Sequence, residues 1–208
     1  MRDEDLEQEL QELEEIDGML STGLLDRNES VLVVIDVQER YIPHLYEGAR
    51  VVEASRRLIE GAKLVGVPVL VTEQYPEGLG PTTKVLRDVL PAGTAPIAKR
   101  TMSCAAEPAF VAALRDTERM QVVIAGIEAQ ACVNQTVHDL IAADYETHVV
   151  VDALSSRFRR DYDVAVERQI RAGAIPTTVE AVLLEWVRTA DAPEFQKIRQ
   201  LIRDPLPA

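Results

Sequence analysis

The chain has few cysteines, histidines and aromatic residues, and each shortage excludes a class of protein. Its two cysteines, Cys104 and Cys132, are too few for a disulfide scaffold or a structural zinc site. The histidines His44, His138 and His148 are scattered without ligand spacing, so we expect neither a metal nor a cofactor. Aromatic residues make up only 4% of the chain, so the core has to be built from aliphatic side chains. Two unpaired thiols are typical of a reducing compartment, and we expect a cytoplasmic protein.

Positive charge is also scarce. The 208 residues contain 22 lysines and arginines against 35 aspartates and glutamates, which gives a formal net charge of -13. A nucleic-acid-binding protein needs a basic face to meet phosphates, so this balance argues against a nucleic-acid partner. No apolar run reaches the roughly 18 residues of a membrane span, and the first residues lack the apolar stretch of a secretory signal. We therefore expect a small-molecule substrate and no membrane partner.

From residue 31 onward, short apolar runs alternate with helical segments. The apolar runs predict strands at 31–36, 67–72, 95–99, 121–126, 146–152 and 174–178. The segments between them predict helices at 48–65, 81–90, 106–116, 132–143, 161–172 and 179–189, with a further helix over 192–203. This alternation predicts an α/β fold, a three-layer sandwich in which helices flank both faces of a six-stranded, mostly parallel sheet. We expect residues 31–190 to form one domain, with 1–30 and 191–208 as extensions.

The first 20 residues differ in composition from the rest. Leu6, Leu10, Leu13 and Ile16 recur at spacings of four and three with glutamates between them, which predicts an acidic helix with one apolar stripe. Such a stripe needs a surface to cover. We expect it to lie on its own domain or on a neighbouring subunit, with a dedicated partner-binding arm as the alternative.

Three reactive side chains stand at predicted strand ends. Asp36 closes the first strand, Lys99 closes the third, and Cys132 lies where a helix begins after the fourth. Ligands of open α/β sheets bind beyond the carboxyl ends of the strands, so an acid, a base and a thiol are expected at one edge. Taken singly, each residue also has a structural explanation. Asp36 fits a cap of the turn after the strand, Lys99 fits an exposed surface lysine, and Cys132 fits a small buried hydrophobic residue. A Cys–His dyad is not favoured, because His138 lies six residues beyond Cys132 and on another face of a shared helix.

Four segments carry a resemblance to a known family: VVIDVQERY (33–41), TEQYPEGLGPT (72–82), IAKRTMS (97–103) and AGIEAQACVNQTV (125–137). Together they resemble the isochorismatase-like cysteine hydrolases, in particular the branch that includes the YcaC-type enzymes. The resemblance implies an Asp–Lys–Cys catalytic triad, a homo-oligomer and a non-proline cis peptide bond, here at Ile127–Glu128. Cys132 argues against isochorismate itself as substrate. Residues 37–66 lack the Asp-x-His-x-x-His motif by which nicotinamidases bind a metal.

These residues predict a hydrolase of a small amide or a related C–N bond that works through an acyl-enzyme on Cys132. Asp36 takes the thiol proton, and Lys99 is expected to lower the thiol pKa. Backbone N–H groups of Glu128 and Cys132 are expected to meet the oxyanion.

The sequence alone leaves alternatives for the residues that line the pocket and for the activity of the protein. Gln38, Gln74 and Tyr75 are candidate pocket residues, although Gln74 and Tyr75 also fit a structural turn. The other readings are a non-catalytic binding or scaffold protein of the same fold, and a thiol redox sensor that uses Cys132 and Cys104.

Overall fold

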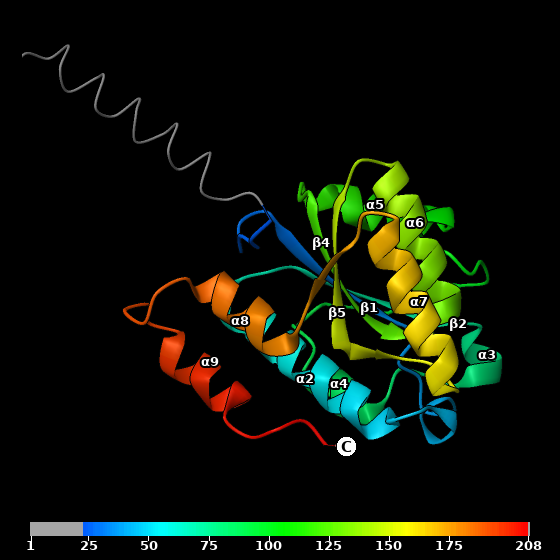
Figure 1. Cartoon of the computed structure of the whole chain (residues 1–208), viewed down its shortest axis with the longest axis horizontal. Helices are drawn as coiled ribbons and strands as arrows, with labels where there is room; N and C mark the ends of the chain where they lie inside the picture. Colours follow the sequence, from blue (N-terminus) through cyan, green and yellow to red (C-terminus); the bar gives the residue numbers. More distant parts are fainter. Residues whose placement is uncertain (1–22, 208) are drawn as a thin grey trace, which may run out of the picture.

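Six parallel strands form one sheet in the order β3-β2-β1-β4-β5-β6 (Figure 1). The computed structural model describes residues 23–207 of the chain. The strands are β1 (Ser30–Ile35), β2 (Val69–Gln74), β3 (Ile97–Lys99), β4 (Gln121–Ile127), β5 (Glu146–Ser155) and β6 (Ile175–Thr177). Every residue of the central strand β1 is buried, as its unbroken apolar run predicts for a strand covered on both faces. The predicted six-stranded parallel sheet is confirmed, with β5 three residues longer than expected.

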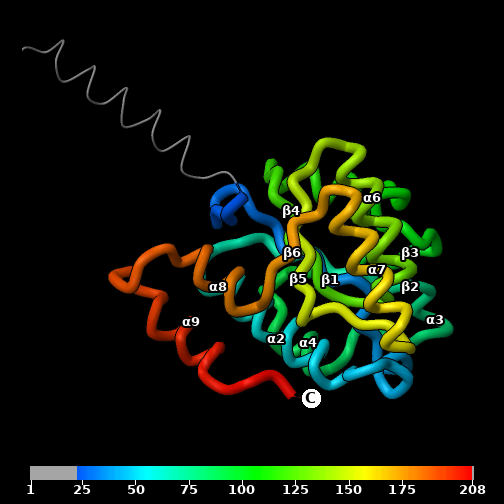
Figure 2. The backbone as a smooth tube through the Cα atoms, viewed as in Figure 1, coloured from blue at the N-terminus to red at the C-terminus, as the bar shows by residue number. Residues whose placement is uncertain are grey.

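Helices cover both faces of this sheet (Figure 1 and Figure 2). They are α2 (Gly48–Val65), α3 (Pro76–Leu79), α4 (Lys84–Arg87), α5 (Pro108–Asp116), α6 (Asn134–Ala142), α7 (Arg159–Arg171), α8 (Val179–Val187) and α9 (Phe195–Ile202). Short helical turns add η1 (Ile42–His44), η2 (Cys104–Ala106) and the π-helical turn η3 (Ala129–Val133). Helices α2, α8 and α9 pack on one face and α5, α6 and α7 on the other, so the three predicted layers are present.

Alternate residues of β1 point into two separate hydrophobic clusters. Leu32 and Val34 pack with α2 and α8, whereas Val33 and Ile35 pack with α5 and α6. Both clusters consist mainly of Val, Leu, Ile and Ala, as the shortage of aromatic residues requires. The sheet is therefore held rigidly from both sides, and its carboxyl edge is a fixed base for a site.

The segment 81–90, predicted as one helix, is not one helix. Only α4 (Lys84–Arg87) is helical there, and an unpredicted turn, α3, precedes it. Thr82 forms an isolated antiparallel bridge with Gln38, and the Pro81 carbonyl accepts a hydrogen bond from the Glu39 N–H. The prediction was wrong because these contacts, distant in sequence, hold the start of the segment extended.

The chain continues after α8 into one further helix. α9 packs on α2 and α8 through the buried Ile198. The predicted acidic helix over residues 1–20 lies outside the described residues. Within residues 23–207, no helix combines the length and the hydropathy that a membrane crossing requires.

Candidate active site

The sheet brings the three predicted reactive residues to its carboxyl edge. Asp36 follows β1 directly, Lys99 is the last residue of β3, and Cys132 lies in η3, the turn that follows β4. All three side chains are buried. Asp36 and Cys132 line a cavity of about 260 Å³, and Lys99 lies behind Asp36. Strands β1, β2, β3 and β4 are consecutive in the sheet, which explains why residues so far apart in sequence meet.

Asp36 and Lys99 form a buried ion pair. The Lys99 Nζ donates to Asp36 Oδ2 at 2.8 Å, and the Thr72 hydroxyl donates to Asp36 Oδ1 at 2.7 Å. Lys99 Nζ has further acceptors in Gln74 Oε1 at 2.6 Å and in the carbonyls of Thr101 and Met102. Because every polar atom of the pair is satisfied, its geometry is fixed before any substrate arrives.

Charges around Lys99 keep its side chain protonated. Burial works to lower the pKa of Lys99, but the Asp36 carboxylate and the nearby thiols raise it, and the net direction is upward. The site therefore holds a permanent ammonium group beside a carboxylate.

Cys132 lies next to this pair. Its Sγ is 3.9 Å from Gln74 Oε1 and 3.9 Å from Met102 Sδ. The Thr136 hydroxyl donates to the Cys132 carbonyl at 2.7 Å, which ties η3 to the first turn of α6. The same Gln74 Oε1 accepts from Lys99 Nζ, so one amide oxygen contacts both the thiol and the ammonium group.

The ionisation of Cys132 differs from the expectation. Burial raises the pKa of the Cys132 thiol to about 12, the Asp36 charge raises it further, and Lys99 opposes both only in part. Lys99 lowers the thiol pKa as expected, but the cost of desolvating a thiolate and the charge of the nearby Asp36 carboxylate outweigh its effect. A pKa this high corresponds to a neutral Cys132 thiol near neutral pH, with the Asp36 carboxyl group close to it.

The second thiol, Cys104, is placed differently. It lies in η2, it is fully buried, and it does not line the cavity. Its Sγ is 3.8 Å from the Thr72 hydroxyl, and burial raises its pKa to about 11. Cys104 contributes to packing beneath the Asp36–Lys99 pair.

The backbone around η3 is unusual. The peptide bond between Ile127 and Glu128 is cis, at the position that the resemblance implies. Gly126 has φ +122°, and a Cβ there would lie 2.1 Å from the Ile35 carbonyl oxygen. A side chain at this position would push β4 away from β1, so glycine is required where the two central strands approach most closely.

The Glu128 side chain is buried and fully engaged. Its Oε2 accepts from the Tyr41 hydroxyl at 2.9 Å, and its Oε1 accepts from Arg157 Nε at 3.1 Å and from Gln130 Nε2 at 3.2 Å. Burial and the Glu128 carboxylate raise the pKa of Tyr41 to about 12. The carboxylate therefore joins η3 to two other loops that surround the cavity.

The candidate pocket residues divide into two kinds. Gln38 is fully buried and donates to the carbonyls of Gln74 and Gly80, while its Oε1 accepts from the Gln74 N–H. Gln74 and Tyr75 line the cavity at the end of β2. Tyr75 is partly exposed, and the Arg100 guanidinium stacks on its ring at 4.5 Å. Gln38 thus fastens the loop after β2, although it also borders the cavity.

Four further residues line the cavity that sequence reasoning did not name: Tyr41, Leu79, Met102 and Ala131. Each of them falls within one of the four segments that carry the family resemblance. Their presence in those segments was the available signal, but the sequence does not say which residues face the cavity.

A thiol and a carboxylate that line one small cavity, with an ammonium group paired to the carboxylate from behind, are suited to nucleophilic attack with proton transfer. Within the described part of the chain, residues 23–207, no group of three or more His, Cys, Asp or Glu side chains is placed to hold a metal ion.

Residues 30–181, which contain this whole arrangement, match the family model described as the isochorismatase domain. The chain belongs to the isochorismatase family. It is 38% identical over 188 residues to isochorismatase domain-containing protein 2A of Mus musculus, an alignment that covers 90% of this chain and 89% of the mouse protein. The family and its fold support a hydrolase.

Solved structures with similar folds support the same assignment. The structure described as the MAR1 ribonuclease from Caenorhabditis elegans is 37% identical, with a TM-score of 0.85 and coverage of 89% of this chain and 95% of that one. YcaC from Escherichia coli, described as an octameric hydrolase of unknown specificity, is 23% identical with a TM-score of 0.80, over 86% of this chain and 90% of that one. The likeness to YcaC is a likeness of fold.

Proposed function

We propose that the protein is a cysteine-dependent hydrolase that cleaves a small amide or a related C–N bond through an acyl-enzyme on Cys132. One observation carries the proposal: the buried Asp36–Lys99 pair and the Cys132 thiol meet at a single cavity. The volume of that cavity, about 260 Å³, suits a small molecule. Membership of a family of hydrolases supports the reaction type.

The first half of the reaction forms the acyl-enzyme. Asp36 takes the proton from Cys132 as Sγ attacks the carbonyl carbon, and the electron pair of the C=O bond moves to the oxygen. N–H groups of Glu128 and Cys132 meet this oxyanion. When the C=O bond re-forms, the C–N bond breaks and the amine leaves with the proton from Asp36.

The second half releases the product. A water molecule enters the cavity, Asp36 takes one of its protons, and the hydroxide oxygen attacks the thioester carbon. The C–S bond breaks, a carboxylic acid leaves, and the thiolate takes the proton back from Asp36. Atoms and charge balance over the cycle, because one amide and one water yield one acid and one amine.

Lys99 and the high thiol pKa fit this cycle. A thiol with a pKa of about 12 is almost entirely protonated near neutral pH, so its proton has to leave during the attack. That requirement assigns Asp36 the role of general base. Lys99 holds the Asp36 carboxylate in place at 2.8 Å and stabilises the negative charge that passes between carboxylate and thiolate.

We also propose that the protein is cytoplasmic, acts on small molecules without a nucleic-acid partner, and assembles as a homo-oligomer. The net charge of -13 opposes binding of a polyanion. The octameric state described for YcaC of Escherichia coli supports assembly. The name of the Caenorhabditis elegans relative makes RNA cleavage the competing activity, so RNA belongs in the test.

The test is a turnover screen over small amides, carbamates and ureas, together with a single-stranded RNA oligonucleotide. The wild-type protein is compared with Cys132→Ala and with Cys104→Ala, which removes a thiol that does not line the cavity. We expect release of ammonia or amine that Cys132→Ala abolishes and Cys104→Ala retains. RNA cleavage without amide turnover, or turnover that survives in Cys132→Ala, would overturn the proposal.

A further inference from the structure

A second cavity adjoins the catalytic one. It has a volume of about 480 Å³ and shares two lining residues, Tyr41 and Leu79, with the cavity that holds Cys132. Its other lining residues are Arg40, His44, Arg157 and Phe158. The shared walls place the two cavities side by side, and we call the second one the mouth.

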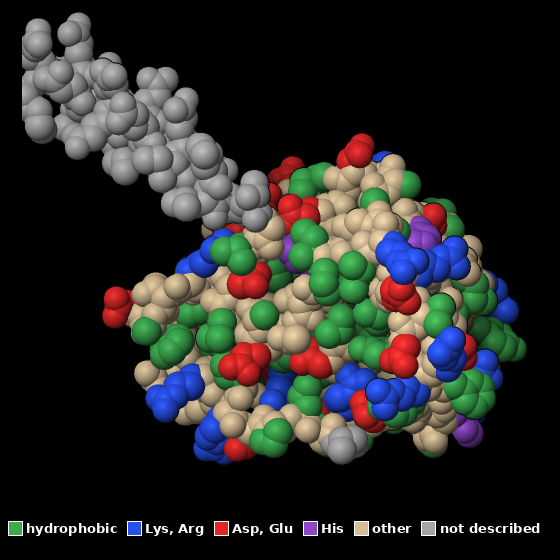
Figure 3. All heavy atoms as spheres, in the orientation of Figure 1, with side chains coloured by type: hydrophobic (Ala, Val, Ile, Leu, Met, Phe, Trp, Pro, Cys, Tyr) green, Lys and Arg blue, Asp and Glu red, His purple; other side chains and the backbone are tan. Residues whose placement is uncertain are grey.

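The mouth is positively charged. Of its six lining residues two are arginines and one is histidine, and no carboxylate lines it. The chain as a whole has a net charge of -13, so the charge of the mouth is opposite in sign to that of the whole chain. Over α7, which begins directly after the mouth residue Phe158, Arg side chains alternate with Asp and Glu side chains, so the excess of positive charge does not extend along this helix (Figure 3). A positive cavity in an acidic protein attracts small anions and raises their local concentration.

The two arginines do not contribute equally. Arg157 Nε donates to Glu128 Oε1 at 3.1 Å, so the charges of Arg157 and Glu128 largely offset each other. Arg40 forms no ion pair with any carboxylate in residues 23–207. The mouth therefore carries about one uncompensated positive charge, that of Arg40.

The Arg40 side chain is also held in position. Its Nη1 donates to the Gly78 carbonyl at 2.7 Å, and its aliphatic part runs along Gly80, with Cγ 3.6 Å from the place a Cβ would occupy. Its Nε and Nη2 have no acceptor within the described residues. These two nitrogens form the edge of a guanidinium that binds a carboxylate with two parallel hydrogen bonds.

We infer that the substrate is a monoanion, an amide that carries a carboxylate at its far end, and that Arg40 binds this carboxylate in the mouth while the amide carbonyl lies at Cys132. This inference rests on the proposed amidase function. A single surplus charge matches one carboxylate, and the Glu128 carboxylate beside Arg157 disfavours a dianion. The Arg40 site gives the catalytic cavity a specificity-determining contact.

The test measures binding separately from turnover. In a Cys132→Ala background, calorimetry compares the monoamides of malonic, succinic and glutaric acid with the neutral diamides of the same length. For the length that spans the two cavities we expect the monoamide to bind at least ten-fold more tightly than its diamide. Arg40→Gln in the same background should reduce that preference to about two-fold or less, and Arg40→Glu should reverse it toward an amide with a terminal ammonium group.

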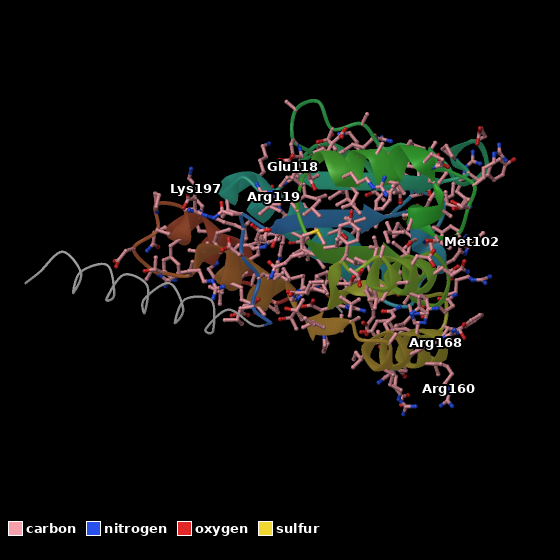
Figure 4. The ribbon with its side chains drawn as sticks, turned by 90° about the horizontal axis from the view of Figure 1, so that it is seen from above. Met102, Glu118, Arg119, Arg160, Arg168 and Lys197 are labelled. Atoms are coloured by element: carbon pink, nitrogen blue, oxygen red, sulfur yellow. The ribbon has the colours of Figure 1, made fainter. Side chains whose placement is uncertain are left out.

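The matched control is Lys197→Gln, which removes one positive charge from an exposed position on α9. Lys197 lies at the other end of the molecule from Met102, which marks the catalytic cavity (Figure 4). This control should keep the full preference for the anion. Because Arg40 is exposed, its replacement should not disturb folding, and an unchanged melting temperature verifies this.

The two proposals fail in different ways. Equal binding of monoamides and diamides at every length, or a preference that Arg40→Gln retains, overturns the inference about Arg40. Turnover of neutral amides would leave the amidase proposal intact in that case. Conversely, Arg40-dependent anion binding without hydrolysis of any amide by the wild-type protein supports the anion site and overturns the amidase proposal.

Discussion

Replacing Asp36 by asparagine is expected to make Cys132 easier to alkylate and, at the same time, to abolish hydrolysis. In the wild-type protein burial raises the pKa of the thiol to about 12 and the Asp36 charge adds to this, with Lys99 in opposition. Asparagine removes the negative charge but keeps the size of the side chain. Its Oδ1 still accepts from Lys99, and the Thr72 hydroxyl can accept from its Nδ2. Lys99 also keeps its acceptors in Gln74 and in the carbonyls of the following loop, so the ammonium remains beside the thiol.

The size of the effect follows from Coulomb's law. Two unit charges about 5 Å apart at an effective dielectric constant of about 20 interact by about 3 kcal/mol. Loss of the Asp36 charge therefore favours the thiolate about a hundredfold near neutral pH. Hydrolysis should fall by about a thousandfold, because a positioned general base contributes between about a hundredfold and ten-thousandfold to such reactions.

The assay is the rate of carbamidomethylation of Cys132 between pH 7 and 10, followed by peptide mass spectrometry in a Cys104→Ser background. The wild-type rate should rise with pH throughout this range without a plateau, because the thiolate fraction increases until pH reaches the pKa of about 12. Asp36→Asn should react faster at every pH, and Lys197→Gln should behave as wild type. A wild-type rate that levels off below pH 9, or an Asp36→Asn rate no faster than wild type, would refute the reasoning.

Four further outcomes are expected. Cys104→Ser should keep most amide turnover in a steady-state assay while Cys132→Ser loses nearly all of it, and equal losses would mean that the nucleophile is misassigned. Exhaustive chelation should leave turnover unchanged, since the proposed steps use only side chains and water; loss of activity that added metal restores would contradict this. Gly126→Ala should cost about 3 kcal/mol of unfolding free energy in urea titration, because the Cβ would lie 2.1 Å from the Ile35 oxygen, and an unshifted midpoint would disprove the close approach. Light scattering at micromolar concentration should give a dimer or a larger assembly, and a monomer would be the contrary result.

The strand ends were predictable from the sequence because their signal is local. Asp36 and Lys99 are polar residues at the close of short apolar runs, and parallel strands bring their carboxyl ends to the same edge. The cis bond at Ile127–Glu128, next to Gly126, was predicted on other grounds. No local pattern predicts the cis bond, and only the resemblance to relatives indicated it.

Features that depend on distant contacts were not predictable. The segment 81–90 was expected to be a helix because its own residues allow one, but its bridge to Gln38 holds it extended. The partners of the Glu128 side chain, Tyr41 and Arg157, lie on loops far apart in sequence, and the sequence alone does not name them. The net shift of the Cys132 pKa was not predictable for the same reason, since it depends on how deeply the folded chain buries the thiol and on which charges lie beside it.

The placement of Asp36, Lys99 and Cys132 has a consequence for how such proteins diversify. These residues stand on strand ends and on the turn after β4, which the two hydrophobic clusters fix from both sides. Arg40 and Phe158, by contrast, stand on connecting loops, and such loops tolerate change far better than packed strands do. In the proposed function, bond cleavage therefore depends on packed strand ends and substrate choice on loop residues, even where the two are as near in sequence as Asp36 and Arg40. A lineage can exchange one loop and acquire a new substrate while its reaction stays the same.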